Sequence, residues 1–274
     1  MNTAFKRTLL STLVLPFALG VQSASAAMIN DWGYTVNSTF SDWTESAGSG
    51  AVTASDGDRV LTWGVPTSQH PNQSSVSITD VSATSGLITN GGSVDGGIFT
   101  HTNNVISANA AALLSFDLNS MLTLTPFDPA GASLAPETRT FNARFKETPN
   151  NNNCVEASVT NCDDIFTLGN IEELGAIPTA MGFEFASPSF ILDGYRYTVF
   201  LELTGLAALG DDACTTAGAA LGCVGLLTEE NAVNNFDTRF RITAAKVPEP
   251  GTLALLGLGL AGLGLSRRKS AAKA

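Results

Sequence analysis

Histidine and basic side chains are scarce in this sequence. Only two of its 274 residues are histidines, His70 and His101, which leaves little material for histidine-based metal binding or acid–base catalysis. Residues 27–246 carry 8 lysines and arginines against 24 aspartates and glutamates, a net charge of −16. A surface this acidic repels phosphate groups, so nucleic acid and anionic lipid are excluded as expected partners.

Two reactive-site signatures are also missing. No G-x-S-x-G stretch marks a nucleophilic serine, and no C-x-x-C pair marks a zinc or thioredoxin-like site. The four cysteines instead form two close pairs, Cys154 with Cys162 and Cys214 with Cys223. Export would permit disulfides. The spacing favours these local pairs, but counting alone leaves crossed pairs such as Cys154–Cys223 open.

The first 26 residues have the three parts of a secretory signal peptide. Lys6-Arg7 supplies the charge, residues 8–21 are mostly apolar, and Ala24-Ser25-Ala26 gives the small-x-small pattern before a cleavage site. We therefore expect a short signal helix that is removed during export by the Sec machinery. Residues 27–246 would then form the exported domain.

The C-terminal residues 247–274 also have three parts in a fixed order. They are Val247-Pro248-Glu249-Pro250, the uncharged residues 252–265 and the cations Arg267-Arg268-Lys269. A helix of this apolar length spans about 21 Å, which is short for a bilayer core of about 30 Å. The pattern predicts a short transmembrane helix, with thinning of the bilayer or snorkelling by the flanking cations, and with its basic end in the cytoplasm.

This tail resembles the PEP-CTERM sorting signal, with Pro248-Glu249-Pro250 as the signature. In that family the signal is read by exosortase, a membrane transpeptidase-like enzyme of Gram-negative bacteria that make exopolysaccharide. The resemblance implies a precursor held in the inner membrane and processed near Pro-Glu-Pro. The mature protein would then reach the cell surface or the extracellular space, with exopolysaccharide or a biofilm matrix as the implied partner.

The exported domain has the pattern of a β-sheet protein. Apolar and polar residues alternate with the period of two that is typical of half-buried strands, and Asp193-Gly194 is a two-residue hairpin signal. The predicted strands are 60–63, 76–81, 97–100, 114–119, 122–125, 141–146, 183–185, 189–192, 195–203 and 236–242. Helical signals are limited to turns at 107–112 and 228–231. The sequence therefore predicts an all-β, antiparallel two-sheet sandwich of the jelly-roll kind.

Two segments are expected to be long loops in this sandwich. Residues 148–164 are polar, and residues 206–222 are rich in glycine and alanine. The first segment contains Cys154 and Cys162, and the second contains Cys214 and ends next to Cys223. Each loop would therefore be tied by its own disulfide.

One segment places a histidine among hydroxyl and amide side chains. It reads Thr100-His101-Thr102-Asn103 and lies at the end of a predicted strand. The segment resembles the THxN family of PEP-CTERM proteins and the domains called choice-of-anchor, and no enzymatic activity comes with that resemblance. From the residues we expect His101 to hydrogen-bond backbone and fix a turn. Ligand or metal binding is the alternative, ahead of catalysis.

Calcium is the metal that the acidic loops would favour, because it prefers oxygen ligands from such loops. The candidate pairs are Asp56 with Asp58, Asp163 with Asp164, and Asp211 with Asp212. The twelve-residue D-x-D-x-D-G loop is absent, and neighbouring aspartates in turns are usually solvated. No cofactor is therefore expected, with calcium as the exception to test.

These features predict a non-enzymatic exported surface or matrix protein. The alternative is a lectin-like carbohydrate-binding module, with calcium as an aid and Trp32, Trp43 and Trp63 as faces for stacking sugars. Trp63 lies in a strand-like run and is expected in the core. A hydrolase is the third hypothesis, and a glycosidase would need two carboxylates at a fixed separation that the sequence does not specify.

Overall fold

Two antiparallel β-sheets form the body of the protein, which is mostly β with 56% of the structure in strands. The computed structural model describes residues 27–150, 154, 162–248 and 257–260. One of the sheets is curved into a half-barrel. The predicted all-β, two-sheet architecture is confirmed, whereas the jelly-roll connectivity stays a prediction.

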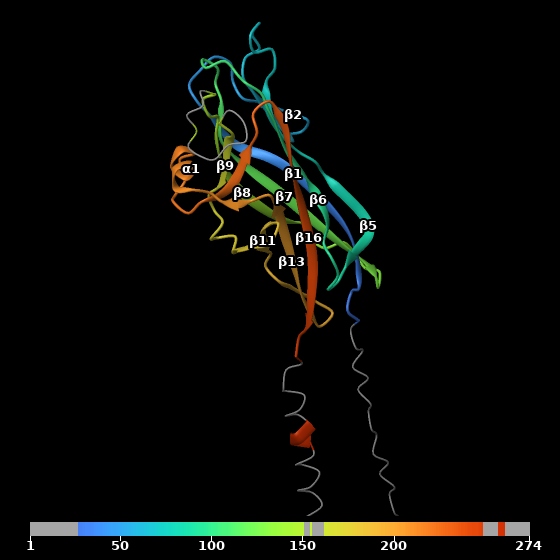
Figure 1. Cartoon of the computed structure of the whole chain (residues 1–274). Coiled ribbons are helices and arrows are strands. Elements are labelled where there is room, and N and C mark those ends of the chain that lie inside the picture. The colour runs from blue at the N-terminus through green and yellow to red at the C-terminus, as the bar shows by residue number, and fades with distance from the viewer. Residues whose placement is uncertain (1–26, 151–153, 155–161, 249–256, 261–274) are drawn as a thin grey trace, which may run out of the picture.

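The first sheet has seven strands. In spatial order they are β14 (Ala207–Ala208), β15 (Val224–Thr228), β9 (Asp164–Leu168), β8 (Glu137–Lys146), β7 (Leu113–Asp128), β1 (Asp31–Glu45) and β5 (Val81–Ile88). The long central strands β1 and β7 pair along most of their length, from Asp31 opposite Asp128 to Glu45 opposite Leu113. They run diagonally across the molecule (Figure 1).

The second sheet has nine strands. In order they are β10 (Ala176–Pro178), β11 (Gly182–Ala186), β13 (Tyr195–Thr204), β16 (Ala232–Lys246), β6 (Val94–Asn103), β4 (Ser74–Ile78), β3 (Val60–Trp63) and β2 (Thr53–Ser55), with β12 (Phe190–Leu192) pairing beside β13. A short helix, α1 (Asp211–Thr216), lies in the segment 206–222 that was predicted to be a loop.

Most predicted strands lie inside observed ones, and the differences have local causes. The predicted strands 114–119 and 122–125 are parts of the single strand β7. The predicted strand 76–81 is wrong as one strand, because β4 ends at Ile78 and β5 starts at Val81. Asp80 makes the break, since it accepts hydrogen bonds from the backbone of Ser38 and from Arg59.

The core lies between the sheets in two clusters of buried side chains. The larger cluster is rich in phenylalanine and includes Trp63, Phe116 and Phe166. The smaller one surrounds Trp32 and Tyr197, whose rings meet edge to face with centroids 5.2 Å apart. Both tryptophans are fully buried, so the expectation that Trp63 belongs to the core is confirmed.

Both local disulfides are present. Cys154 pairs with Cys162 and Cys214 with Cys223, with Cα–Cα distances of 4.8 and 5.7 Å. The crossed pairs that spacing left open are therefore excluded. The second bond joins α1 to the start of β15, and both of its cysteines are buried.

Removing the two disulfides is expected to have unequal effects. The loops are of nearly equal length, with sequence separations of 8 and 9, so loop closure alone predicts about 2–3 kcal/mol for each. Cys214 and Cys223 are also packed in the interior, whereas Cys154 is exposed. We expect the Cys214→Ser/Cys223→Ser double variant to lose more free energy of unfolding than Cys154→Ser/Cys162→Ser. Denaturant unfolding of both would test this, and equal losses would contradict it.

The chain ends leave the sandwich close to one another. Strand β1 begins and β16 finishes at the same end of the molecule (Figure 1). The predicted signal helix at 1–26 lies outside the described residues, as does most of the predicted span 252–265, of which 257–260 are helical. None of the helices that the structure describes is long and apolar enough to cross a membrane.

Candidate functional site

Sheet register brings three carboxylates together at the edge of the larger core cluster. Lys146 of β8 lies opposite Ile165 of β9, so the next residues, Glu147 and Asp164, face each other across the end of this pair. On the other side of β9, Asp164 is paired with Thr228 of β15. Glu230 follows two residues later, in the connection to β16. Carboxylate oxygens of Glu147, Asp164 and Glu230 all lie within 4.8 Å of one another.

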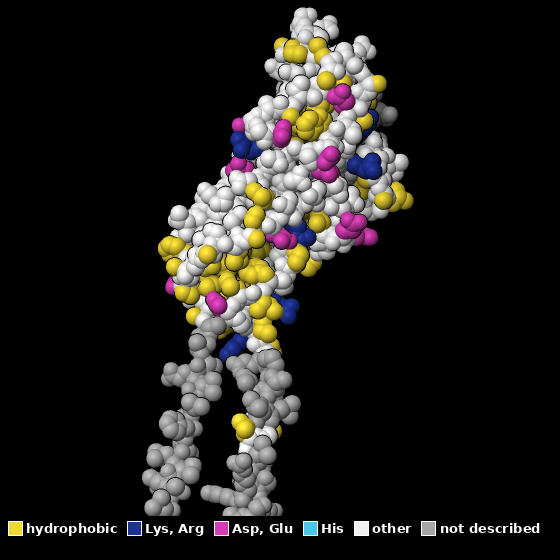
Figure 2. Space-filling model, turned by 180° about the vertical axis from the view of Figure 1, so that it is seen from behind, with side chains coloured by type: hydrophobic (Ala, Val, Ile, Leu, Met, Phe, Trp, Pro, Cys, Tyr) yellow, Lys and Arg dark blue, Asp and Glu magenta, His cyan; other side chains and the backbone are white. Residues whose placement is uncertain are grey.

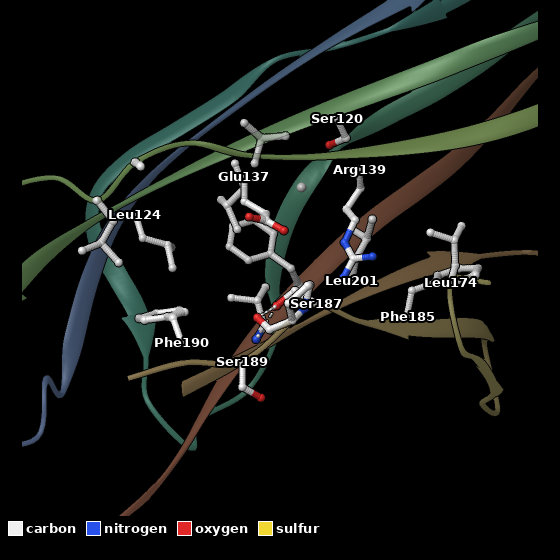
Figure 3. A pocket seen from close by; sticks show the side chains of 18 of the residues that line it. Ser120, Leu124, Glu137, Arg139, Leu174, Phe185, Ser187, Ser189, Phe190 and Leu201 are labelled. Carbon is white, nitrogen blue, oxygen red and sulfur yellow. Dashed lines mark hydrogen bonds between the residues drawn. The ribbon is translucent and has the colours of Figure 1, made fainter. Parts of the chain in front are cut away.

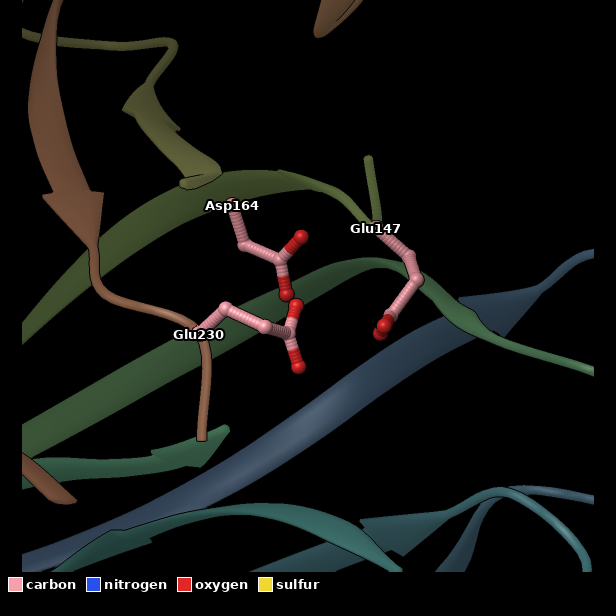
Figure 4. A group of neighbouring side chains, drawn as sticks. All are labelled: Glu147, Asp164 and Glu230. Atoms are coloured by element: carbon pink, nitrogen blue, oxygen red, sulfur yellow. The ribbon is translucent and has the colours of Figure 1, made fainter. Parts of the chain in front are cut away.

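The three carboxylates converge from three separate segments. Figure 4 shows the carboxylates of Asp164 and Glu230 facing each other, with the side chain of Glu147 directed toward the same space. Asp164 is fully buried and Glu230 is 5% exposed, whereas Glu147 is partly exposed as a residue. Like charges placed directly opposite one another destabilise a sheet unless something neutralises them. We call this group the acidic cluster.

Burial makes ionisation of the acidic cluster unfavourable. It raises the pKa of Glu147 to about 7, although the hydrogen bond from Trp63 opposes the shift. Burial, and then the charge of Glu147, hold the pKa of Asp164 well above its ordinary value. The pKa of Glu230 is raised as well, again chiefly by burial. In this position the three groups either retain protons or share a cation.

Neighbouring donors hold all three of these carboxylates, and Glu230 accepts from the side chain of Asn150 and the backbone of Asn231. The indole Nε1 of Trp63 donates to Oε2 of Glu147 at 2.9 Å. The backbone N–H of Thr148 donates to Oδ1 of Asp164 at 2.7 Å. The second oxygen of Asp164, Oδ2, is buried without a hydrogen-bond partner.

The Thr100-His101-Thr102-Asn103 motif lies beside the acidic cluster and is connected to it by hydrogen bonds through Thr228. Nδ1 of His101 and Oγ1 of Thr228 are 2.9 Å apart, and the Thr228 hydroxyl donates to the carbonyl oxygen of Asp164 at 3.2 Å. Because that hydroxyl proton is already used, Nδ1 of His101 must be the donor to Thr228. Nδ2 of Asn103 donates to the carbonyl oxygen of Thr228 at 3.3 Å. The motif therefore anchors the strand end that leads to Glu230.

His101 itself is enclosed by aromatic rings. It is fully buried, is stacked on Trp63 at 5.6 Å, and meets Phe145 and Phe166 edge-on. Burial lowers its pKa to about 3, so the imidazole is neutral at physiological pH. The expected backbone partner and turn differ from what is found: Nδ1 bonds a threonine hydroxyl, and His101 lies within β6. Thr100 lies at the surface, where it donates to Asn235 at 2.7 Å.

Of the aspartate pairs that the sequence singled out for calcium, only one reaches the acidic cluster. Asp164 belongs to it. Asp56 is instead paired with Arg59 at 2.9 Å in the tight turn between β2 and β3. Asp211 and Asp212 are exposed in the first turn of α1. Acidic side chains there interact favourably with the positive end of the helix dipole. Glu147 and Glu230 were not among the sequence candidates, because neither lies in an aspartate pair.

A separate cavity lies between the two sheets, at the junction of the two core clusters. It encloses about 410 Å³, within the range of small-molecule sites. Apolar side chains such as Leu124, Phe185 and Phe190 dominate its lining (Figure 3). Arg139 is one of the lining residues and donates to the carbonyl oxygen of Ala186 at 2.9 Å. The polar side chains in the lining are Ser120, Glu137, Arg139, Ser187 and Ser189.

The outer surface shows no concentration of basic side chains on the face seen in Figure 2. Lysine, arginine and acidic side chains are scattered there among uncharged ones, and hydrophobic side chains gather toward the end from which the chain ends leave. Each of the three tryptophans is at least partly buried: Trp32 and Trp63 are fully enclosed, and Trp43 packs against the larger core cluster. The predicted sugar-stacking faces are therefore not presented to solvent by Trp32 or Trp63.

Comparison with known proteins places one part of the chain. A model of the PEP-CTERM protein-sorting motif matches residues 246–269. This match includes every predicted sorting residue, from Val247 to Lys269. No curated protein and no solved structure matches the chain. The motif indicates a protein that exosortase sorts to the cell surface.

Proposed function

We propose that this protein is a non-enzymatic component of the cell surface or extracellular matrix that associates with exopolysaccharide after exosortase has processed it. The observation that carries the proposal is the sorting motif at residues 246–269, which begins at the last residue of β16. Export by Sec, retention of the precursor in the inner membrane through residues 252–265, and release to the surface or medium are parts of the same proposal.

The geometry of β16 indicates how the domain would be oriented in a precursor held by its tail. The strand has 15 residues, so it separates its two ends by about 50 Å. Its C-terminal end leads directly into the sorting motif. Its N-terminal end follows Glu230 and the acidic cluster. In a precursor held by its tail, the acidic cluster would therefore lie at the end of the domain that points away from the membrane.

The surroundings of His101 support a role without catalysis. Acid–base catalysis needs a side chain that can exchange protons with a substrate near the working pH. His101 is fully buried, and burial lowers its pKa to about 3. We therefore propose that the Thr100-His101-Thr102-Asn103 motif is structural. The placement of Trp32 and Trp63 in the core makes the lectin-like alternative the weaker one.

Fractionation of the natural host would test the proposed association. In cells that make exopolysaccharide, we expect the mature protein in the surface and matrix fraction. In an otherwise identical strain that cannot synthesise exopolysaccharide, we expect the same mature mass but a shift into the medium. A strain without exosortase is the control, and it should accumulate the precursor in the membrane. An unchanged distribution without exopolysaccharide would contradict the association while leaving sorting intact.

A further inference from the structure

We propose that the acidic cluster is a calcium site, in which Glu147, Asp164 and Glu230 supply carboxylate ligands. The site lies at the end of the sandwich away from the sorting motif. It is independent of the exopolysaccharide association proposed above.

Ligand geometry is the first support for the site. Calcium binds oxygen at about 2.3–2.6 Å, so two oxygens on the same ion are at most about 5 Å apart. The three carboxylates each offer an oxygen within 4.8 Å of the others. They come from three segments that the sheet holds in place, at the ends of β8 and β15 and at the start of β9. The three carboxylates would therefore need little movement to bind one calcium ion together.

The unpartnered oxygen of Asp164 is the second, independent support. Asp164 is fully buried, and its Oδ2 has no hydrogen-bond partner, although Oδ1 is satisfied by Thr148. Figure 4 shows this carboxylate directed toward the space that it shares with Glu147 and Glu230. A buried polar oxygen without a partner is costly. A cation between the three side chains would satisfy it.

Among the described residues, Glu147 and Asp164 form no ion pair with an arginine, and only the charge of Lys146 lowers the pKa of Glu147 from nearby. The four ion pairs found among the described residues join Arg59 to Asp56 and to Asp80, Arg239 to Asp237, and Arg241 to Glu184. Each of them lies elsewhere in the molecule. The chemistry of the donors then selects the ion: three carboxylates form a hard, all-oxygen set that suits calcium, whereas softer metals prefer imidazole and thiolate. His101 is already committed to Thr228, and all four cysteines are in disulfides.

Terbium luminescence gives a direct test, because the lanthanide replaces calcium and emits when a nearby indole is excited. Trp63 donates a hydrogen bond to Glu147, which places an antenna beside the site. We would purify the exported protein from its host, remove metals with a chelator, add terbium and excite tryptophan. We expect strong terbium emission that excess calcium abolishes. Trp63→Phe should lower this emission, and Trp43→Phe should leave it unchanged.

Thermal unfolding provides the matching measurement with calcium itself. A ligand at a hundredfold excess over its dissociation constant should raise the Tm of a domain of this size by about 5–10 °C. Glu147→Gln and Asp164→Asn are nearly isosteric and remove one charge each. They should weaken calcium binding by more than about tenfold, because even partners outside the ligand shell contribute that much. Asp211→Asn removes an exposed charge from α1 and should keep the full calcium shift.

Comparing the stability of the wild type and Glu147→Gln after chelation and after addition of calcium distinguishes two possibilities. The cluster either binds calcium or is a group of carboxyls that share protons. Without calcium, Glu147→Gln should be at least as stable as the wild type at pH 8, because one buried charge is gone. With calcium, the wild type should become the more stable of the two. The proposal is overturned if about 10 mM calcium, above the weakest extracellular sites, shifts no Tm and quenches no terbium emission. It is also overturned if Asp164→Asn binds calcium as tightly as the wild type.

Discussion

Replacing Pro248-Glu249-Pro250 with three alanines is expected to stop maturation and leave a membrane-held precursor. Proline has no backbone N–H and disfavours helix in the residue before it. The native segment therefore interrupts any helix between β16, which ends at Lys246, and the apolar residues that begin at Thr252. Alanine is the best helix former. The altered tail would extend the helix and remove the extended segment that a processing enzyme can reach.

The measurement is the mass of the mature C-terminus together with fractionation of an exosortase-bearing host. The wild type should be processed near residues 248–250, and the variant should remain as an uncleaved membrane species. A second Pro-Glu pair, Pro136-Glu137, lies in the exported domain and offers a matched control. Pro136→Ala/Glu137→Ala should leave processing normal. If the tail variant reaches the surface or medium with normal mass, residues 247–274 act only as a weak membrane helix.

His101→Ala is expected to cost about 3 kcal/mol of unfolding free energy at pH 7. The substitution opens a cavity among Trp63, Phe145 and Phe166, and truncating a buried ring to alanine typically costs about 3–5 kcal/mol. Imidazole is smaller than phenyl, so the lower end applies. The hydrogen bond to Thr228 is lost as well. Thr102 of the same strand is partly exposed, and Thr102→Ala should change stability by less than about 0.5 kcal/mol.

The cost of His101→Ala should shrink as the pH falls. The folded protein holds the pKa of His101 at about 3, below the value of 6.5 expected when unfolded. Below pH 6.5 the unfolded chain binds a proton that the folded chain refuses, so the wild type loses about 1.4 kcal/mol per pH unit until about pH 3. Alanine has no such proton. Denaturant unfolding at pH 7 and pH 5 would measure this difference, and a cost that stays constant would contradict a buried neutral imidazole.

The comparison between wild type and variant isolates His101 from the acidic cluster. Glu147 has a raised pKa, so the stability that it contributes is present at low pH and is lost as pH rises through about 7. This dependence is opposite in sign to that of His101. It is present in both proteins and cancels in their difference. A profile of the wild type alone would mix the two effects.

Strand prediction from the sequence succeeded where one face of a strand is apolar. In β8, buried Phe141, Ala143 and Phe145 alternate with exposed residues, and the alternation was visible in the sequence. The longest interior strand of the N-terminal region, β1, was not predicted, although Tyr34, Val36 and Phe40 alternate in the same way. Small polar residues such as Ser38, which is buried in β1, weakened the pattern. Periodicity reports burial only where the buried residues are apolar.

The candidate site was predictable only in part. The sequence drew attention to His101 and Asp164, one as part of a resemblance and the other as part of an aspartate pair. It gave no reason to connect them with Glu147 and Glu230, which lie 17 residues before Asp164 and 66 residues after it in the numbering of the chain. Their meeting depends on β9 lying between β8 and β15. Strand order is set by packing of the whole sandwich, which no local pattern encodes.

The sequence by itself determined the sorting motif, and it favoured the disulfide pairs, which the structure then decided. The sorting motif at 246–269 is linear, because an enzyme reads a continuous segment. The pairs Cys154–Cys162 and Cys214–Cys223 close short loops, because close cysteines meet easily. Only the tertiary structure decided the acidic cluster and the neutral state of His101. Both depend on burial, and burial is created by strands that are distant in sequence and adjacent in space, where the loss of water shifts the pKa of each group.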